Sequence, residues 1–186
     1  MATTTAPEPV KYFVAILWVD AAALSGAKAR LAERFGPIDF EGPDRAFDLT
    51  NYYESEMGAP LARQLIAFGP LRGPEELVAA KESCNAIEDA LAGPKGRLVN
   101  LDVGYLDHNK IVLASAKAAG QKIYLSNGIY ADFVARYGEG RYQPFPWTFP
   151  DFKDGRYDDE LARLRASYLD QVKMWRRAAN VQAGAP

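Results

Sequence analysis

The sequence predicts an α+β fold, in which one mixed, largely antiparallel sheet with a C-terminal β-meander carries packed helices, including a long amphipathic C-terminal helix. Three observations predict it. Residues 12–19 form an almost continuous apolar run, which is typical of a strand covered on both faces. Asn127-Gly128 separates two segments rich in β-formers, which indicates a hairpin. Apolar residues recur at three- and four-residue spacing over residues 157–175, which indicates a helix with one buried face.

Local patterns predict the elements of the N-terminal half. Residues 20–35 are expected to form a helix, because an aspartate can cap its start and a Gly-Pro pair follows its last apolar position. Residues 38–49 are expected to form two short extended pieces around a Gly-Pro turn, and residues 50–58 a capped helical turn or a loop. A short strand over residues 63–68 and a helix over residues 74–91, opened by proline and glutamates, complete this half.

The C-terminal half is predicted to be richer in strands. Residues 97–101 are expected to form a short strand, and residues 111–120 a helix closed by glycine. Residues 122–137 are expected to form the hairpin, and residues 141–145 a further strand of the meander. Because prolines follow closely and cannot donate to a central ladder, this last strand is expected at an edge of the sheet.

Length and composition indicate one globular domain. The chain has 186 residues, of which 48% are hydrophobic and 25% charged, and this length is enough for a single core. We expect the domain at residues 10–177, between disordered tails at residues 1–9 and 178–186. No apolar run approaches the ~20 residues of a membrane helix, and the N-terminus lacks the apolar segment of an export signal. The expected location is therefore the cytoplasm, and no membrane partner is expected.

Charge and motifs exclude several classes of function. The net charge is about −2 and the 22 Lys and Arg residues are spread along the chain, so nucleic acid is not an expected partner. The only cysteine, Cys84, rules out a disulfide within the chain and a cysteine-rich zinc site. The sequence has no Walker loop and no Gly-x-Ser-x-Gly elbow, and a single histidine leaves little scope for a catalytic triad.

The most chemically varied segment is the polar stretch from Asn100 to Lys110. Asp102 is expected at a strand end, where a carboxylate can act as an acid, a base or a metal ligand. Gly104 is expected to permit a tight turn, and Lys110 to lie in the first turn of the following helix. Because the helix dipole disfavours a lysine there, Lys110 indicates a bound anion or a pairing with Asp102. We therefore expect Asn100, Tyr105 and Lys110 to orient an anionic ligand.

A second polar cluster follows the two predicted extended pieces. Asp48 and Tyr53 are candidate ligand-binding residues, and Glu54 is a candidate catalytic or metal-binding residue. The carboxylates of this cluster could converge with Asp102 and His108 to bind a divalent cation, the one cofactor that the residues indicate. The alternative interpretation is that these side chains are ordinary caps and surface groups, and that the tyrosines only line a wall.

Four segments in this order, residues 35–40, 47–58, 99–106 and 123–131, resemble an uncharacterised bacterial family catalogued as domain of unknown function 4416. The similarity extends over roughly residues 8–175. The resemblance implies that both polar clusters lie in signature segments of that family. Some relatives carry a GTP-binding label, but the resemblance itself implies no activity.

The sequence thus predicts a cytoplasmic protein that binds a small anionic or metal-linked ligand, with hydrolytic chemistry as an open extension. One alternative is a non-enzymatic interaction or assembly module that uses the edge strand and the C-terminal helix, which would allow a homo-oligomer. Another is nucleotide (GTP) binding without a standard P-loop. Whether the protein is an enzyme stays open at this point.

Overall fold

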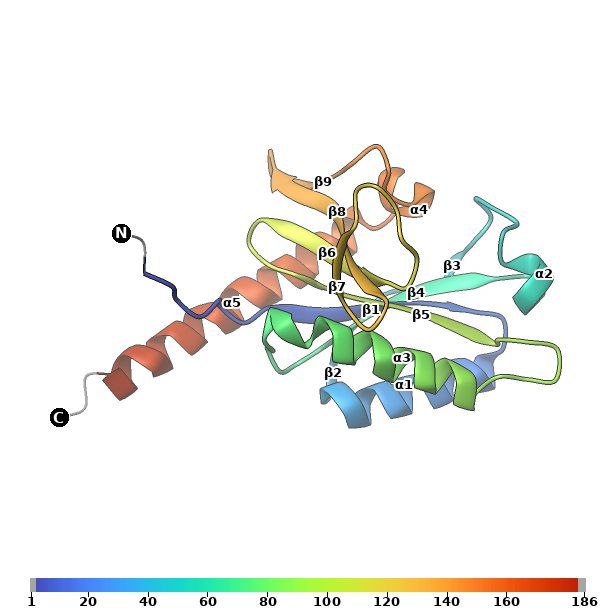
Figure 1. The fold of residues 1–186 in the computed structure, drawn as a ribbon, viewed down its shortest axis with the longest axis horizontal. Coiled ribbons are helices and arrows are strands. Elements are labelled where there is room, and N and C mark those ends of the chain that lie inside the picture. Colours follow the sequence, from blue (N-terminus) through green and yellow to red (C-terminus); the bar gives the residue numbers. More distant parts are fainter. Residues whose placement is uncertain (1–2, 184–186) are drawn as a thin grey trace.

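A computed structural model describes residues 3–183, and within this range it contains a nine-stranded sheet and helices on both of its faces (Figure 1). The strands are β1 Lys11–Trp18, β2 Ile38–Glu41, β3 Arg45–Ala46, β4 Ala62–Phe68, β5 Val99–Leu106, β6 Lys110–Ser115, β7 Ile123–Ser126, β8 Ile129–Gly138 and β9 Arg141–Pro144. The helices are α1 Ala21–Phe35, α2 Glu54–Met57, α3 Leu77–Ala90 after a 3-10 turn at Pro74–Glu76, α4 Pro150–Lys153 and α5 Asp158–Ala183.

The sheet confirms the predicted fold class. Its order is β2-β4-β1-β5-β6-β8-β7, with β3 also paired to β4 and β9 also paired to β8, and each of these pairings is antiparallel. β1 lies at the centre, between β4 and β5, which accounts for its continuous apolar sequence. The hairpin between β7 and β8 turns at Asn127 and Gly128, both with positive φ, as the type I′ turn requires.

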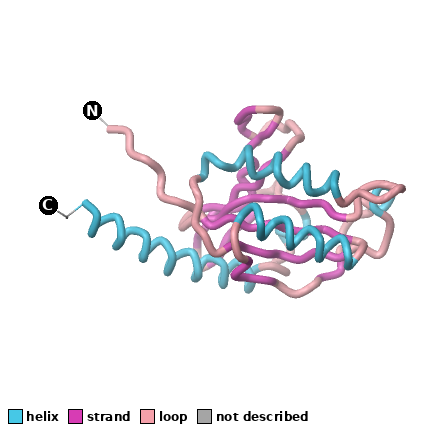
Figure 2. Tube along the Cα trace, turned by 90° about the horizontal axis from the view of Figure 1, so that it is seen from below, coloured by secondary structure: helices cyan, strands magenta, loops and turns pink. Residues whose placement is uncertain are grey.

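Two hydrophobic cores hold the layers together. On one face, α1 and α3 lie side by side and bury Leu31 and Cys84 against β1 and β5 (Figure 2). On the other face, the first half of α5 buries Leu164 and Tyr168 against alternate residues of β1 and β4. β1 therefore contributes side chains to both cores, Val14 to the first and Ala15 to the second, as expected from the two-residue period of a strand.

Residues 111–120 are not the predicted helix; they form β6 and the loop after it. β6 pairs with β5 on one side and with β8 on the other. Residues 111–114 are buried on both faces, so the two-residue alternation that would reveal a strand is hidden, and the alanines that follow imitate a helical sequence. Asp107 caps a hairpin turn in place of a helix, because its Oδ1 accepts hydrogen bonds from the backbone N–H groups of Asn109 and Lys110.

Gly104 also differs from the prediction, since it lies inside β5 and not in a turn. A Cβ at this position would lie 2.4 Å from the carbonyl oxygen of Val112 on β6. The pairing of β5 with β6 covers only Gly104–Leu106 opposite Ile111–Leu113, and beyond Gly104 the two strands part. Residues 99–103 of β5 remain paired with β1, while β6 continues along β8. The sheet is therefore open on one side of residues 99–103.

The two ends of the described chain lie on the same side of the molecule (Figures 1 and 2). Residues 3–9 contain no helix or strand, and Glu8 forms an ion pair with Arg176 of α5 at 2.5 Å. α5 continues to Ala183, past residue 178 where the sequence predicts a tail, and its side chains are exposed from Lys173 to Val181. The outer parts of both predicted tails, residues 1–2 and 184–186, lie outside the described residues. Among residues 3–183, no helix is both long and apolar enough to cross a membrane.

Candidate functional site at the diverging strands

A cleft of about 220 Å³ occupies the opening between β5 and β6. We call it the polar chamber. It is bounded by α3, by the segment before β5, by the loop after β6 and by β8. Its polar lining consists of Tyr53, Lys81, Asn85, Glu88, Arg97, Asn100, Asp102, Ser115, Lys117, Lys122 and Asp132.

The wall from α3 takes the place of the missing neighbour strand. Lys81 Nζ donates a hydrogen bond to the carbonyl oxygen of Leu101 at 3.0 Å, and the Leu101 N–H donates to Glu88 Oε1 at 2.7 Å. Both side chains are buried on the sheet-facing side of the helix, seven residues apart. They satisfy the backbone groups that β6 leaves unpaired when it turns away, and they bring one positive and one negative charge into the chamber.

Arg97 sets the orientation of Asn100. Its Nη1 donates to Glu88 Oε2 at 2.9 Å and to Asn100 Oδ1 at 2.8 Å, while the rest of the guanidinium binds both carboxylate oxygens of Glu56. The hydrogen bonds that Arg97 donates to Glu56, and then the one to Glu88, raise the pKa of Arg97. Since the amide oxygen of Asn100 faces a donor, its Nδ2 must point elsewhere, and this buried atom has no partner among the described residues.

The opposite wall contains the converse case, a buried hydrogen-bond acceptor that lacks a donor among residues 3–183. Lys122 Nζ lies 2.8 Å from Ser115 Oγ and 3.3 Å from Asp132 Oδ2. The other oxygen, Asp132 Oδ1, is buried and has no hydrogen-bond partner in the described part of the chain. Asn100 and Asp132 are only 5% and 4% exposed. The polar chamber therefore contains a buried donor without an acceptor and a buried acceptor without a donor.

Asp102 is held by a buried arginine. Arg63 of β4 donates to Asp151 Oδ2 at 2.6 Å and to Asp102 Oδ2 at 3.2 Å, and its guanidinium carbon lies 4.6 Å from the centre of the Phe47 ring. Burial alone would lower the pKa of Arg63, but the two carboxylates outweigh it and the pKa is raised. Arg63 stays a cation, and Asp102 is paired within the protein.

Three of the seven residues selected from the sequence lie together in the polar chamber: Asn100, Asp102 and Tyr53. Burial and the neighbouring Asp102 raise the pKa of Tyr53 to about 12, so the phenol is protonated at neutral pH. Asp48 and Glu54 lie nearby in sequence but are exposed and line no wall of this chamber. Asp48 is 3.8 Å from Arg156, on another side of the loop.

Tyr105 and Lys110 lie at the opposite end of the β5–β6 pair. They line a separate hollow of about 270 Å³ together with His108. Lys110 is in a strand and pairs with Asp107, so neither the helix dipole nor Asp102 acts on it. His108 is in contact with Tyr168 of α5, with ring centroids 5.1 Å apart. In the described part of the chain, the two polar segments thus share the polar chamber through Tyr53, Asn100 and Asp102.

The expected convergence on a divalent cation is not found. Glu56 is bound by Arg97 and Asp48 lies beside Arg156, while His108 lines the hollow at the far end of β5. Across residues 3–183, no three His, Cys, Asp or Glu side chains lie close enough together to hold a metal ion. The sequence allowed the carboxylates to converge, but in the structure Asp48, Glu56 and Asp102 pair with three different arginines.

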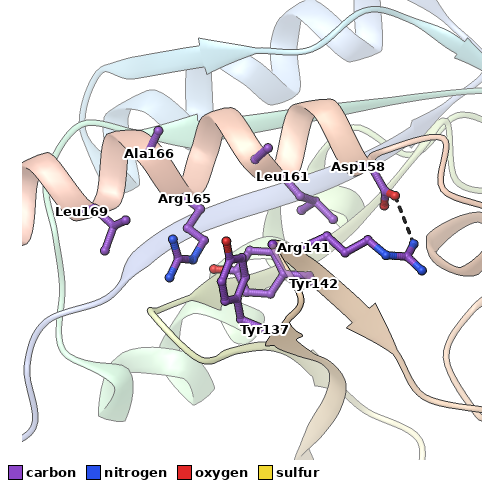
Figure 3. A pocket seen from close by; sticks show the side chains of 10 residues that line it. Tyr137, Arg141, Tyr142, Asp158, Leu161, Arg165, Ala166 and Leu169 are labelled. Carbon is purple, nitrogen blue, oxygen red and sulfur yellow. Dashed lines mark hydrogen bonds and ion pairs between the residues drawn. The ribbon is translucent and has the colours of Figure 1, made fainter.

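A smaller hollow of about 130 Å³ lies between α5 and the β8–β9 edge (Figure 3). Arg165 points into it from α5, and its guanidinium carbon lies 3.5 Å from the centre of the Tyr137 ring. Arg141 closes one end through an ion pair with Asp158 at 3.3 Å. Arg165 and Arg141 both make contacts that hold α5 against the sheet, and we therefore assign this hollow a structural role.

Several residues at the polar chamber were not selected from the sequence: Lys81, Glu88, Arg97, Lys122 and Asp132, which line it, and Arg63, which holds Asp102. One signal was available for the first two. They occupy the same helical face as Leu77 and Cys84, where a charged side chain needs a buried partner. Arg63 gave no such signal, because its partners Asp102 and Asp151 lie 39 and 88 positions away, and Asp132 meets its partner Lys122 only through the β7–β8 hairpin.

The fold and the cleft define a class: a single-sheet α+β domain with a ligand-sized polar chamber where two strands of the sheet part. The chain belongs to the family described as Domain of unknown function (DUF4416), whose model matches residues 8–168. That span contains every residue of the polar chamber and excludes the exposed end of α5. No curated protein and no solved structure matches the chain.

Proposed function

We propose that this domain binds a small anionic ligand in the polar chamber. One observation carries the proposal: Asn100 Nδ2 and Asp132 Oδ1 are buried in the same cleft, and neither has a hydrogen-bond partner within residues 3–183. A buried polar group without a hydrogen bond costs about 1–3 kcal/mol. A ligand that accepts from Asn100 and donates to Asp132 would recover both contributions.

Lys117 supports a negative charge on the ligand. It lies on the exposed loop after β6, and its Nζ donates to the phenol oxygen of Tyr52 at 2.7 Å. Among the described residues it forms no ion pair, whereas Lys81, Arg97 and Lys122 each have a carboxylate within 4 Å. An anionic group at the mouth of the chamber would therefore meet a positive charge that the protein does not itself neutralise.

Asp102 fits a positioning role in this proposal. It lines the chamber, but its ion pair with Arg63 fixes its position. This position lies between the wall that carries Asn100 and the wall that carries Asp132. Together with Tyr53 it limits the shape of the space open to a ligand. Binding is therefore the function that these contacts support, and the hydrolytic extension gains nothing from them.

A thermal-shift panel on the full-length protein tests the proposal. The probes are inorganic phosphate, citrate, GTP and magnesium chloride alone. We expect at least one anionic probe to raise Tm by mass action on the folded state, and Lys117→Ala and Asp132→Asn to remove the shift. The matched controls are Lys173→Ala and Asp170→Asn, on exposed positions of α5. The proposal fails if no anion raises Tm, or if the shift persists in the chamber variants.

A second candidate function, assembly through the edge of the sheet, rests on β7. Its apolar side chains Ile123, Tyr124 and Leu125 are all exposed, and an unprotected edge strand can pair with another chain. Light scattering on the wild type and on Ile123→Lys tests this function. A homo-oligomer that Ile123→Lys dissociates supports assembly; a wild-type monomer at high concentration argues against it.

A further inference from the structure

A second hollow, of about 500 Å³, adjoins the polar chamber. We call it the aromatic chamber. Its apolar lining consists of Phe47, Leu49, Tyr52, Tyr53, Phe149 and Pro150. Tyr53, Lys117 and Phe149 line both chambers, so the two are parts of one continuous cleft.

The rings of this chamber are unusually open to solvent. Tyr52 is 60% exposed and Phe149 39% exposed, although both lie in a concave region. Tyr52 and Tyr53 pack edge to face with ring centroids 5.0 Å apart, and Phe47 meets Tyr53 in the same way at 6.0 Å. These contacts hold the rings in place from the side. Their free surfaces can therefore be covered by a flat group without rearrangement of the chamber.

A third unpartnered polar atom lies in the wall of this chamber. Two of the guanidinium nitrogens of Arg63 bind Asp151 and Asp102, but Nε is buried and has no partner among the described residues. Arg63 is only 3% exposed, and its guanidinium is fixed against Phe47. A heteroatom or hydroxyl group on a ring in the aromatic chamber could accept the hydrogen bond that Nε offers.

Lys117 connects the requirements of the two chambers. Its Nζ lies 4.6 Å from the centre of the Tyr52 ring and lines the boundary between the chambers. A ligand with a ring on Tyr52 and Phe149 would bring an attached negative group to this ammonium. The same ligand would extend its polar end toward Asn100 and Asp132.

We propose that the ligand is a small anion with an attached flat ring, in which the ring fills the aromatic chamber and the anionic group enters the polar chamber past Lys117. This inference rests on the proposed function and adds the chemical class of the ligand. Nucleoside monophosphates and aromatic carboxylic acids share that chemistry, because both join a ring with hydrogen-bonding atoms to a negative group.

Matched pairs of probes test the inference by calorimetric titration of the full-length protein. AMP and GMP are compared with ribose 5-phosphate, and 4-hydroxyphenylacetate is compared with acetate. In at least one pair, we expect the ring-bearing member to bind about tenfold tighter or more, the scale of one base–aromatic stacking contact. The pair that shows the difference distinguishes a nucleotide from an aromatic acid.

Single substitutions test which side chains contact the ring of the probe. Phe149→Ala, and separately Tyr52→Ala, should reduce the affinity advantage of the ring-bearing probe over its ring-free partner about tenfold or more. The control is Trp147→Ala, which removes an exposed ring close in sequence that does not line the cleft. Tyr52→Ala and Phe149→Ala act at exposed side chains on different elements, so loss of folding in one would leave the other to decide the result.

The outcomes separate this inference from the proposed function. If ring-bearing and ring-free anions bind equally, and Lys117→Ala weakens both, the polar chamber binds an anion but the ring assignment is wrong. The ring assignment is also wrong if Phe149→Ala weakens the members of a pair to the same extent. If neither member of any pair binds, both proposals are contradicted.

Discussion

Gly104 of β5 lies so close to Val112 of β6 that a Cβ on Gly104 would be 2.4 Å from the Val112 carbonyl oxygen. No side chain fits between the two strands at this point. Gly104 and its partner Leu113 form the last pair before β5 and β6 part, so this close approach lies where the polar chamber begins. The absence of a side chain at Gly104 is therefore a condition for the cleft.

Gly104→Ala is expected to destabilise the protein and to alter the chamber. Forcing a methyl group against backbone costs about 1–3 kcal/mol, measured as a lower free energy of unfolding in urea. Gly120→Ala is the matched control, because a Cβ there meets nothing within 4 Å. Equal stability of the two variants would show that β5 and β6 can separate without cost.

Glu88→Ala is expected to be one of the most destabilising single changes in the cleft. It removes the partner of the Leu101 N–H, of Arg97 and of Lys81 at once. Loss of one member of a buried charge network costs about 3–5 kcal/mol in unfolding free energy. Asp89→Ala, at the neighbouring exposed position, should change stability by less than about 0.5 kcal/mol. A small effect at Glu88 would contradict its structural role in the wall.

The thiol of Cys84 should react only when the protein unfolds. Burial raises its pKa from 9.0 to about 12, so the folded protein keeps the proton over a pH range in which the unfolded chain loses it. The unfolded state is therefore favoured increasingly as pH rises from 9 toward 12, and the slope should be shallower in Cys84→Ala. Urea unfolding at a series of pH values measures this. Rapid thiol labelling of the folded protein at pH 8 would contradict the burial.

Truncation before α5 and truncation near its C-terminal end should have different effects on folding. Removal of the chain after Asp151 deletes Tyr157, Leu164 and Tyr168, which belong to the core on that face, so this variant should not fold. Removal of residues 178–186 keeps the Arg176–Glu8 pair and should leave Tm within a few degrees of the wild type. Circular dichroism during heating distinguishes the two. Folding of the shorter variant would show that α5 is not required for the core.

Part of this molecule could be predicted because local patterns determine it. The apolar run of β1, the Asn127-Gly128 turn and the three-four spacing of α5 each have one structural solution, and all three were predicted correctly. β6 was not, because burial on both faces removes the alternation of a strand and Ala114 and its neighbours favour a helix. The same error placed Lys110 in the first turn of a helix, whereas the structure has it in strand β6.

One condition that selected residues now found to line the polar chamber is that they interrupt an apolar segment; Tyr53 also lines it but was selected from a polar cluster. Asn100 and Asp102 met that condition and lie in the polar chamber. The contact that fixes Asp102 joins distant residues: Arg63 reaches Asp102 and Asp151 across 39 and 88 positions. No spacing in the sequence reports such pairs. That Lys117 has no ion-pair partner among the described residues, and contacts Tyr52, likewise follows only from the fold.

One measurement tests the central claim most directly: the side-chain amide resonance of Asn100 during titration with the tightest-binding anionic probe. If the polar chamber is the binding site, the Nδ2 protons gain an acceptor and their resonances should shift, while the side-chain amide of Asn109, in the turn at the other end of β5, should not. Resonances of Asn100 that stay fixed while the probe saturates the protein would place the binding site elsewhere and contradict the account.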